Sequence, residues 1–369
     1  MIDEIELRDG AVNFRDFMEL ALYHPGHGYY SSERPRYGRH GDFLTAPSAS
    51  PWYGRILANV LCRAAEVAGP VVFADVASGD GSLIFTVLSE LPPNALDDVA
   101  FVSVEHSPSM RAIQQKRLRE VGVPVRLVAS IGEIDRFIGP VVLHASELYD
   151  AMPVHRVIQR GMTLREFFVT TDRGMLGWSE GEADHRLPRY FQNHGVTLAN
   201  DQIAEVNLQA EKFHARLLEL ASGDGLALVL DYGYPAVRLY NPRGRSGGSL
   251  TAYREHRIVN DPLVDPGRQD LTAHVNWDDL RRSADGAKWR EIGLWPLAEF
   301  LVRGGLAEVV EREGLGIEAD LDARTVSERQ EIKRLLDPDG MGSDLKMLIQ
   351  GRGALAGIAE DLFAAQTSS

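Results

Sequence analysis

The chain has 369 residues, of which 44% are hydrophobic and 25% charged, a composition typical of a globular protein with one elaborated domain or two. The formal net charge of −14 argues against a broad surface for nucleic acid or for an anionic membrane. The single cysteine, Cys62, rules out an intramolecular disulfide and a cysteine zinc cluster, and no histidine pair has convincing metal-ligand spacing, so we predict no metal site. The N-terminus is acidic without a signal-peptide core, and no apolar run has the length of a membrane span. We therefore expect a cytoplasmic protein.

Residues 1–70 are predicted to form a helical cap with a long loop. The segment 14–23, FRDFMELALY, has the pattern of a short amphipathic helix. The stretch after it is rich in glycine, proline and aromatic residues, and ordered loops of such length are often lids or binding loops. Ser50 and Pro51 suit the N-cap and the first position of the next helix.

Strand and helix patterns alternate after residue 70. Apolar strand patterns begin with VVFADVA and AFVSVEHS, continue with VRLVAS and VVLHASE, and recur in GLALVLDYG at 225–233. Continuous apolar strands separated by helices indicate a mostly parallel sheet that is covered on both faces. We predict one α/β domain over 71–353 with a late strand at 345–353.

Two interruptions and a tail complete the predicted organisation. The alternation breaks over 151–224, which we interpret as an insertion with a helix and with a hairpin that turns at Asp172-Arg173-Gly174. A second, helical insertion is predicted over about 296–340, and residues 354–369 are expected to form a C-terminal tail.

The segment 73–83, FADVASGDGSL, is the most informative stretch of the chain. An apolar strand ends at the acid Asp75, and small residues including Gly79 and Gly81 lead into a helical pattern. Such a turn lets backbone N–H groups at a helix N-terminus approach a ligand closely. A purely structural turn, or a site for another nucleotide, is the alternative.

Three carboxylates mark the ends of later strands. Glu105 closes the second strand, where an acid in a nucleotide-binding βαβ unit accepts hydrogen bonds from both ribose hydroxyls. A solvated strand-end carboxylate is the alternative. Glu147 and Asp150 leave the fourth strand together, and such a pair can receive the planar fork of a guanidinium. They could equally fix an amine, supply a base, or decorate a helix N-terminus with favourable charge.

The chain resembles the methyltransferase family that contains the mitochondrial complex I assembly factor and its bacterial relatives. The resemblance runs from about Phe14 to about Arg352 and is specific because several motifs occur in order. These motifs are ALYHPGHGYY at 21–30, GDFLTAP at 41–47, VEHSPSMRAIQ at 104–114, SELYDAMPV at 146–154, LDYGY at 230–234, SLTAYREHR at 249–257 and PGRQDLTAHVNW at 266–277.

This resemblance implies a Rossmann-like class I methyltransferase fold with a mostly parallel seven-stranded sheet and an N-terminal cap. It implies S-adenosyl-L-methionine as methyl donor, S-adenosyl-L-homocysteine as product, and acceptors that include an arginine side chain on a protein partner. A homodimer is left open. The residues expected to bind the donor are Asp75, Ala77, Gly79, Gly81, Glu105, His106, Ser130, Tyr30, Gly41, Asp42 and Phe43. Glu147 and Asp150 are the expected catalytic pair. The acceptor is expected to contact Tyr149, Pro153, Asp231, Tyr232, His256, Asp270 and His274.

The chain also departs from the family pattern. Ala77 replaces a glycine, which is tolerable if its φ is negative and costly if φ is positive. Asp80 replaces an arginine, Ser48 a glutamate and Ser146 an asparagine. An arginine N-methyltransferase is the first hypothesis. A methyltransferase for a peptide or small molecule of specialised metabolism is the second, and an assembly factor without catalysis is the third.

Overall fold

The computed structural model describes residues 1–31, 50–254, 257–285, 288–316, 319–320 and 322–363. Four of the predicted site residues, Gly41, Asp42, Phe43 and His256, lie outside the described residues, as does Ser48. Among the described residues, no helix combines the length and the apolar character needed to cross a lipid bilayer. The same part of the chain contains no group of three or more side chains placed to hold a metal ion.

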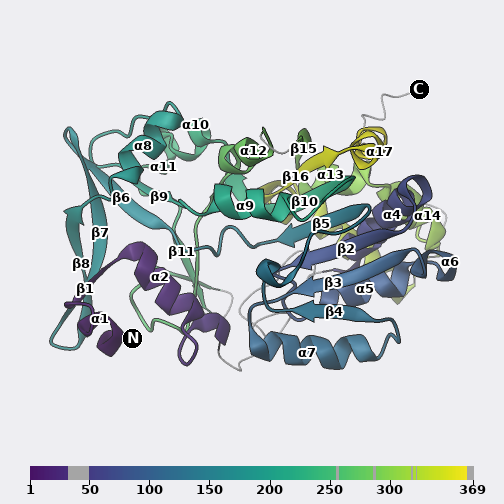
Figure 1. The fold of residues 1–369 in the computed structure, drawn as a ribbon, viewed down its shortest axis with the longest axis horizontal. Helices are drawn as coiled ribbons and strands as arrows, with labels where there is room; N and C mark the ends of the chain where they lie inside the picture. The colour runs from purple at the N-terminus through teal and green to yellow at the C-terminus, as the bar shows by residue number, and fades with distance from the viewer. Residues whose placement is uncertain (32–49, 255–256, 286–287, 317–318, 321, 364–369) are drawn as a thin grey trace.

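The centre of the fold is a mixed sheet in the order β15-β16-β10-β5-β2-β3-β4 (Figure 1). Its strands are β2 (Val71–Val76), β3 (Val99–Val104), β4 (Val125–Val128), β5 (Val141–Ser146), β10 (Gly225–Tyr234), β15 (Arg290–Pro296) and β16 (Leu345–Arg352). The five strands from β4 to β10 are parallel, and only β16 runs against its neighbours. The predicted seven-stranded, mostly parallel sheet is therefore confirmed. A short eighth strand, β14 (Val275–Asn276), extends beside the end of β10.

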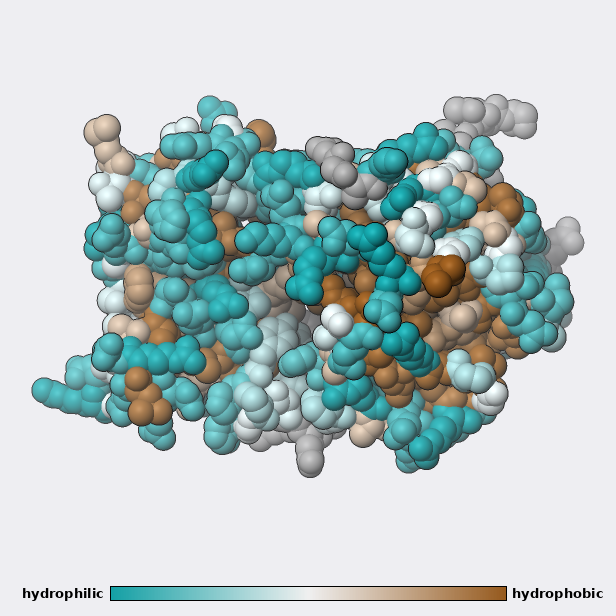
Figure 2. Space-filling model, viewed as in Figure 1, coloured by the Kyte–Doolittle hydropathy of each residue, from teal (hydrophilic) through white to brown (hydrophobic). Residues whose placement is uncertain are grey.

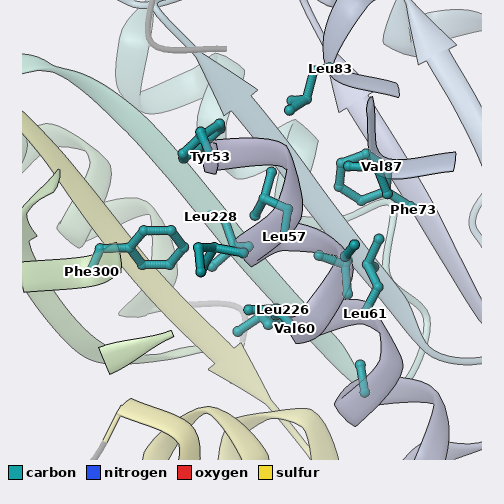
Figure 3. Close-up of a cluster of buried hydrophobic side chains, with 14 of the residues drawn as sticks. Tyr53, Leu57, Val60, Leu61, Phe73, Leu83, Val87, Leu226, Leu228 and Phe300 are labelled. Carbon is teal, nitrogen blue, oxygen red and sulfur yellow. The ribbon is translucent and has the colours of Figure 1, made fainter. Parts of the chain in front are cut away.

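Apolar side chains on one face of this sheet pack against α4 (Pro51–Ala68), α5 (Ser82–Glu90) and α17 (Ala354–Phe363). Figure 3 shows Leu57 and Leu61 of α4 beside Leu226 and Leu228 of β10, with Phe300 closing the cluster from a later helix. As predicted, Ser50 caps α4: its hydroxyl accepts a hydrogen bond from the backbone N–H of Trp52. Residues 354–363, expected to be a tail, form α17 because their apolar positions complete this core.

The other face is covered by α9 (Ala210–Leu218) and α12 (Trp277–Asp285). Trp277 and Leu280 of α12 are fully buried in a cluster with apolar residues of β10 and β16. The helix α7 (Pro108–Arg119) follows β3 and lies at the β4 edge of the sheet (Figure 1). On the face of Figure 2, hydrophilic residues predominate and hydrophobic ones gather mainly over β2 and β3. Both faces of the sheet are thus covered, as the apolar strand patterns indicate.

The insertion at 151–224 forms a second sheet rather than a hairpin and helix alone. It contains β6 (His155–Arg160), β7 (Thr163–Asp172), β8 (Met175–Glu182) and β9 (Ile203–Val206), together with α8 (Arg186–Asn193). The predicted hairpin turn is present, since Asp172 pairs with Met175 across it. The N-terminal strand β1 (Ala11–Asn13) joins this sheet by pairing antiparallel with β7 (Figure 1).

The N-terminal cap otherwise consists of α1 (Ile2–Glu6), α2 (Phe14–Tyr23) and the turn Tyr29–Ser31. It packs on a small third sheet of β11 (Thr251–Arg254), β12 (Arg257–Val259) and β13 (Asp270–Thr272) through Ala252 and Leu271. The remaining short helices are α6 (Pro93–Leu96), α10 (Ala236–Leu239), α11 (Pro242–Arg245) and the turn Ile131–Glu133.

The segment between β15 and β16 is helical, as the sequence pattern indicates. Its helices are α13 (Leu297–Arg303), α14 (Leu306–Arg312), α15 (Ala323–Leu335) and α16 (Met341–Asp344). Phe300 of α13 is fully buried, with its ring centroid 6.2 Å from Tyr53 and 5.4 Å from Phe363. This single side chain therefore joins α13 to α4 and α17.

We expect Phe300→Ala to lower the free energy of unfolding by about 3–5 kcal/mol, because it leaves a cavity where three helices meet. Val302→Ala on the same helix is the matched control: Val302 is 54% exposed and its truncation should cost less than about 0.5 kcal/mol. Urea unfolding followed by circular dichroism measures both. Equal losses for the two variants would contradict this account of the core.

Candidate active site

A cavity of about 680 Å³ lies at the carboxyl ends of β2, β3, β5 and β10. Ligands of open α/β sheets bind at this edge, and a cavity of this size can hold a nucleoside-sized molecule with part of a second reactant. The structure brings twelve of the predicted site residues to its wall: Tyr30, Asp75, Ala77, Gly79, Glu105, His106, Ser130, Glu147, Asp150, Tyr232, Asp270 and His274.

The loop between β2 and α5 has an unusual backbone. Ala77, Gly79 and Gly81 all adopt positive φ, at 60°, 54° and 76°. The positive φ of Ala77 makes this replacement of a glycine energetically costly, because an L-residue with a Cβ is strained in the left-handed region. At Gly81, an added Cβ would lie 3.0 Å from Cγ of Gln114. The turn brings the backbone of 77–79 to the cavity wall.

Gln114 of α7, which sequence analysis missed as a site residue, holds this loop in place. Its side chain is fully buried, and its amide Nε2 donates to Ser78 Oγ at 2.8 Å and to the carbonyl oxygen of Gly79 at 2.7 Å. Its Oε1 accepts from Ser103 Oγ at 2.8 Å. Its position in the motif at 104–114 was the available signal, but the hydrogen bonds join residues far apart in sequence.

The charge reversal at Asp80 is neutralised within the fold. Arg117 of α7 approaches the Asp80 carboxylate at 2.7 Å and also donates to its carbonyl oxygen at 2.9 Å. The other carboxylate oxygen of Asp80 accepts the N–H of Ser82 at the start of α5. Asp80 therefore lies on the cavity wall as half of an ion pair rather than as an isolated negative charge.

Glu105 is held by the same loop. One carboxylate oxygen accepts the N–H of Gly79 at 2.9 Å, and the other accepts the N–H of Ser107 at 2.7 Å. A carboxylate offers about four lone-pair positions, so each oxygen can still accept a second hydrogen bond. Burial of this group raises its pKa to about 6, and the two backbone N–H donors oppose that rise. This geometry suits a ligand with two neighbouring hydroxyls, such as a ribose.

Three side chains form a buried chain of hydrogen bonds that begins at the cavity wall. Asp75 Oδ1 lies 2.7 Å from Nδ1 of His144, and Nε2 of His144 lies 2.7 Å from the hydroxyl of Tyr53. Burial, and then the charges of Asp75 and Glu147, raise the pKa of Tyr53, so its phenol stays protonated. The second oxygen of Asp75 is buried with no hydrogen-bond partner among the described residues, and Asp75 lines the cavity. An amino group of a ligand would satisfy it.

At the β5–β10 side the cavity is acidic. Glu147, Asp150 and Asp270 line it, and Asp231 lies directly behind. Asp150 is 5% exposed, and its Oδ1 has no hydrogen-bond partner among the described residues. Burial, and then the charges of Asp231 and Asp270, raise the pKa of Asp150 well above its usual value. Glu147 has a φ of 51°, so the backbone at this strand end is strained as at Ala77.

Tyrosines enclose this acidic end. The hydroxyl of Tyr30 donates to Asp270, lying 3.0 Å from both carboxylate oxygens, and the hydroxyl of Tyr23 donates to the carbonyl of Ala151 at 2.9 Å. The two rings stack with centroids 5.4 Å apart. Tyr30 was predicted to bind the donor; in the structure its hydroxyl contacts Asp270, one of the acids that line the cavity.

Four of the predicted residues do not reach the cavity wall: Gly81, Tyr149, Pro153 and Asp231. Asp231 is fully buried because it holds backbone, accepting the N–H groups of Tyr149 at 2.9 Å and Tyr232 at 2.8 Å. Tyr149 points into the core, where its hydroxyl lies 2.6 Å from His214 Nδ1. Direct acceptor contact, predicted for Tyr149 and Asp231, is therefore corrected to support of the loop that carries Asp150.

This sheet, this glycine loop and this strand-end acid together define a Rossmann-like methyltransferase that uses S-adenosyl-L-methionine. A model of a family of S-adenosyl-L-methionine-dependent methyltransferases, Methyltransf_28, matches residues 54–294. The chain belongs to this family. The interpretation as an assembly factor without catalysis is accordingly not retained, and Asp80, which partly motivated it, is neutralised by Arg117.

Similar curated proteins are also named as methyltransferases. The chain is 28% identical over 316 residues to the mitochondrial protein arginine methyltransferase NDUFAF7 of Danio rerio, covering 74% of this chain and 69% of the relative. It is 25% identical to the Drosophila melanogaster homologue, covering 95% and 84% of the two chains. These relatives are named as mitochondrial proteins, so the prediction of a cytoplasmic location is wrong.

Among solved structures, a protein from Burkholderia thailandensis bound to S-adenosyl-homocysteine superposes with a TM-score of 0.84 at 27% identity. The match covers 99% of this chain and 93% of that protein. A native crystal structure of a COG1565 superfamily protein from the same organism gives a TM-score of 0.82 at 28% identity.

We expect Ala77→Gly to raise the free energy of unfolding by roughly 0.5–1 kcal/mol. Glycine relieves the left-handed strain, and its greater freedom in the unfolded chain offsets part of the gain. The converse control is Gly81→Ala, which should destabilise by more than about 1 kcal/mol because of its positive φ and its contact with Gln114. A loss of stability in Ala77→Gly, measured by urea unfolding, would contradict the assigned backbone.

We expect the dissociation constant of S-adenosyl-L-homocysteine to rise about tenfold between pH 7.5 and pH 5, measured by calorimetric titration. If Glu105 holds the ribose, the ribose hydroxyls donate to its ionised carboxylate, and its pKa of about 6 means that most molecules are protonated at the lower pH. In Glu105→Gln, binding should be weak and nearly independent of pH. A wild-type affinity that does not change over this range would remove Glu105 from the donor site.

Proposed function

We propose that this chain transfers a methyl group from S-adenosyl-L-methionine to an arginine side chain of a protein or peptide. The observation that carries this proposal is the buried carboxylate oxygen of Asp150 at the cavity wall, which has no hydrogen-bond partner among the described residues, with Glu147 and Asp270 beside it. Such a group of carboxylates favours a cation and repels a carboxylate or phosphate acceptor. The curated relatives, named arginine methyltransferases, give independent support.

The donor would be held by the residues that fit it. Glu105 has lone pairs left for the ribose, and the 77–79 backbone lies against the cavity. The oxygen of Asp75 that has no partner in the described part of the chain suits an amino group. His106 and Ser130 line the wall at the ends of β3 and β4, where we propose that they border the base. S-adenosyl-L-methionine supplies an activated methyl group, so the protein needs no group to activate it.

The residues at the acidic end would hold and orient the acceptor. A guanidinium is planar and has five N–H donors, which match two carboxylates approached in its plane. Asp150 and Glu147 would fix that plane so that one nitrogen faces the donor side of the cavity. Asp231 positions Asp150 through the backbone of Tyr149, and Tyr23 and Tyr30 would exclude water from this end.

A proton must also leave. The guanidinium nitrogen that gains a methyl group has to lose one of its hydrogens to return to a single positive charge. The carboxylate of Asp150 is the proposed acceptor, because burial and neighbouring acids raise its pKa and make it a stronger base than an ordinary aspartate. The phenol of Tyr232 is a poor base here, since burial and then Glu147 raise its pKa and keep it protonated.

We expect Asp150→Asn to lower kcat by about 10²–10⁴-fold while the dissociation constant of the donor stays within about twofold. The probe is a mixture of peptides with a fixed central arginine and radiolabelled S-adenosyl-L-methionine. Asp172→Asn, at the exposed β7–β8 turn, is the matched control and should leave activity unchanged. Full activity in Asp150→Asn, or methylation confined to peptides with lysine in place of arginine, would refute the proposed function.

A further inference from the structure

One aromatic ring beside the cavity carries three cations. Around the ring of Tyr234, at the end of β10, the guanidinium carbon of Arg245 lies 4.0 Å and that of Arg238 4.5 Å from the centroid. The ammonium nitrogen of Lys346 lies 4.6 Å from the same centroid. We call Arg238, Arg245 and Lys346, with Tyr234, the Tyr234 cluster. Three cations on one ring repel each other, and cation–π attraction offsets only part of that repulsion.

The Tyr234 cluster is not fully neutralised within the described part of the chain, where the charge of Asp344 acts on Lys346 without forming an ion pair. None of its three cations forms an ion pair there, although arginine–carboxylate pairs are common over the rest of the surface, as at Arg254–Asp265 and Arg281–Glu291. Burial, and then the charge of Arg238, lower the pKa of Lys346, and the charge of Asp344 opposes that shift only in part, as expected for a partly enclosed site of like charge. In a chain with a net charge of −14, this concentration of positive charge is a local exception.

A direct hydrogen bond connects the cluster to the cavity. Arg245 donates to Nδ1 of His274 at 2.8 Å, and His274 lines the cavity together with Asp344, two residues before Lys346. The rings of His274 and Tyr234 lie 5.5 Å apart. Burial, and then the neighbouring charges of Arg245 and Lys346, lower the pKa of His274 to about 4, so the ring is neutral and accepts this bond. Arg238 is exposed at the outer side of the cluster, so the group leads from the cavity to the surface.

Strand order separates this positive group from the donor. Glu105 follows β3 and Asp75 lies on β2. Tyr234 is the last residue of β10, and Lys346 of β16 pairs with Asp231 of β10. The strand β5, with Glu147 just after it, stands between the two sets. Along the sheet edge the order is therefore donor loop, acidic end of the cavity, Tyr234 cluster. The carboxylate of the donor is expected beside the donor loop, so it is not the ligand of the Tyr234 cluster.

We propose, on the basis of the proposed function, that the Tyr234 cluster binds the carboxylate of an aspartate or glutamate close to the methylated arginine. The acceptor is then a peptide segment in which an arginine and an acidic residue are neighbours. Its arginine enters the acidic end of the cavity and its carboxylate meets Arg245, Arg238 and Lys346 at the rim. A nucleic-acid ligand is disfavoured, because the acidic residues of the cavity wall and the net charge of −14 repel a polyanion, whereas the proposed peptide presents its arginine to those acids and a single carboxylate to the cluster.

The test uses the full chain and short acetylated, amidated peptides, so that a single aspartate is their only carboxylate. Each peptide has one arginine, and the aspartate is moved one position at a time along either side. Matched peptides carry asparagine or lysine in its place. We expect a KM at least fivefold lower for the best aspartate peptide than for its asparagine counterpart, and a higher KM still for lysine.

The charge-reversed double variant R238E/K346E should lose the preference for aspartate and gain one for lysine. Arg243→Glu, an exposed arginine of α11 that is not on the Tyr234 ring, is the matched control and should keep the wild-type order. Unchanged donor affinity by calorimetry shows that each variant is folded.

Equal KM values for the aspartate, asparagine and lysine peptides would overturn this inference while leaving arginine methylation intact. An aspartate preference that persists in R238E/K346E would also overturn it. Binding of a single-stranded RNA that is lost in R238E/K346E would assign the cluster to nucleic acid instead. Absence of methylation on every arginine peptide would refute the proposed function itself, which is a distinguishable result.

Discussion

The site depends on one constraint: acids at the carboxyl ends of parallel strands must meet at a single edge of the sheet. Asp75, Glu105, Glu147 and Asp231 lie at the ends of β2, β3, β5 and β10. Four such groups can be enclosed together only if most of their oxygens have partners. The imidazole of His144 serves Asp75, and backbone N–H groups serve Glu105 and Asp231. One oxygen of Asp75, and one of the neighbouring Asp150, has no hydrogen-bond partner among the described residues, and both residues line the cavity. These buried oxygens can therefore bind cationic groups of a ligand.

Two of the departures from the family pattern, Asp80 and Ala77, are accommodated by hydrogen bonds and an ion pair with α7. Asp80 adds a negative charge next to the glycine loop, and Arg117 of the following helix removes it. Ala77 adds a methyl group in a left-handed backbone, and Gln114 holds the loop in that conformation through Ser78 and Gly79. Strain at Ala77 therefore persists because hydrogen bonds over-determine the glycine loop, as is usual at functional sites.

Local sequence pattern predicted correctly those elements that depend on neighbouring residues. The helix at 14–23, the cap at Ser50, the hairpin at 172–174 and the parallel strands have the predicted form, since each follows from spacing or from turn chemistry within a short window. It failed where contacts are distant. The pairing of β1 with β7, the role of Gln114 and the inward direction of Tyr149 depend on partners far along the chain. Asp231 was identified as important but given the wrong role, because sequence alone cannot tell an acid facing a cavity from one that holds backbone.

The place of β16 has a consequence for biosynthesis. The last strand of the chain lies between β10 and β15, pairing with β10 from Gly225–Arg352 to Tyr232–Leu345. During translation the sheet therefore stays open at β10 until nearly the whole polypeptide has left the ribosome. Until then, the long apolar edge of β10 is available to other strands, so nascent chains and truncated products are the species that a chaperone must protect.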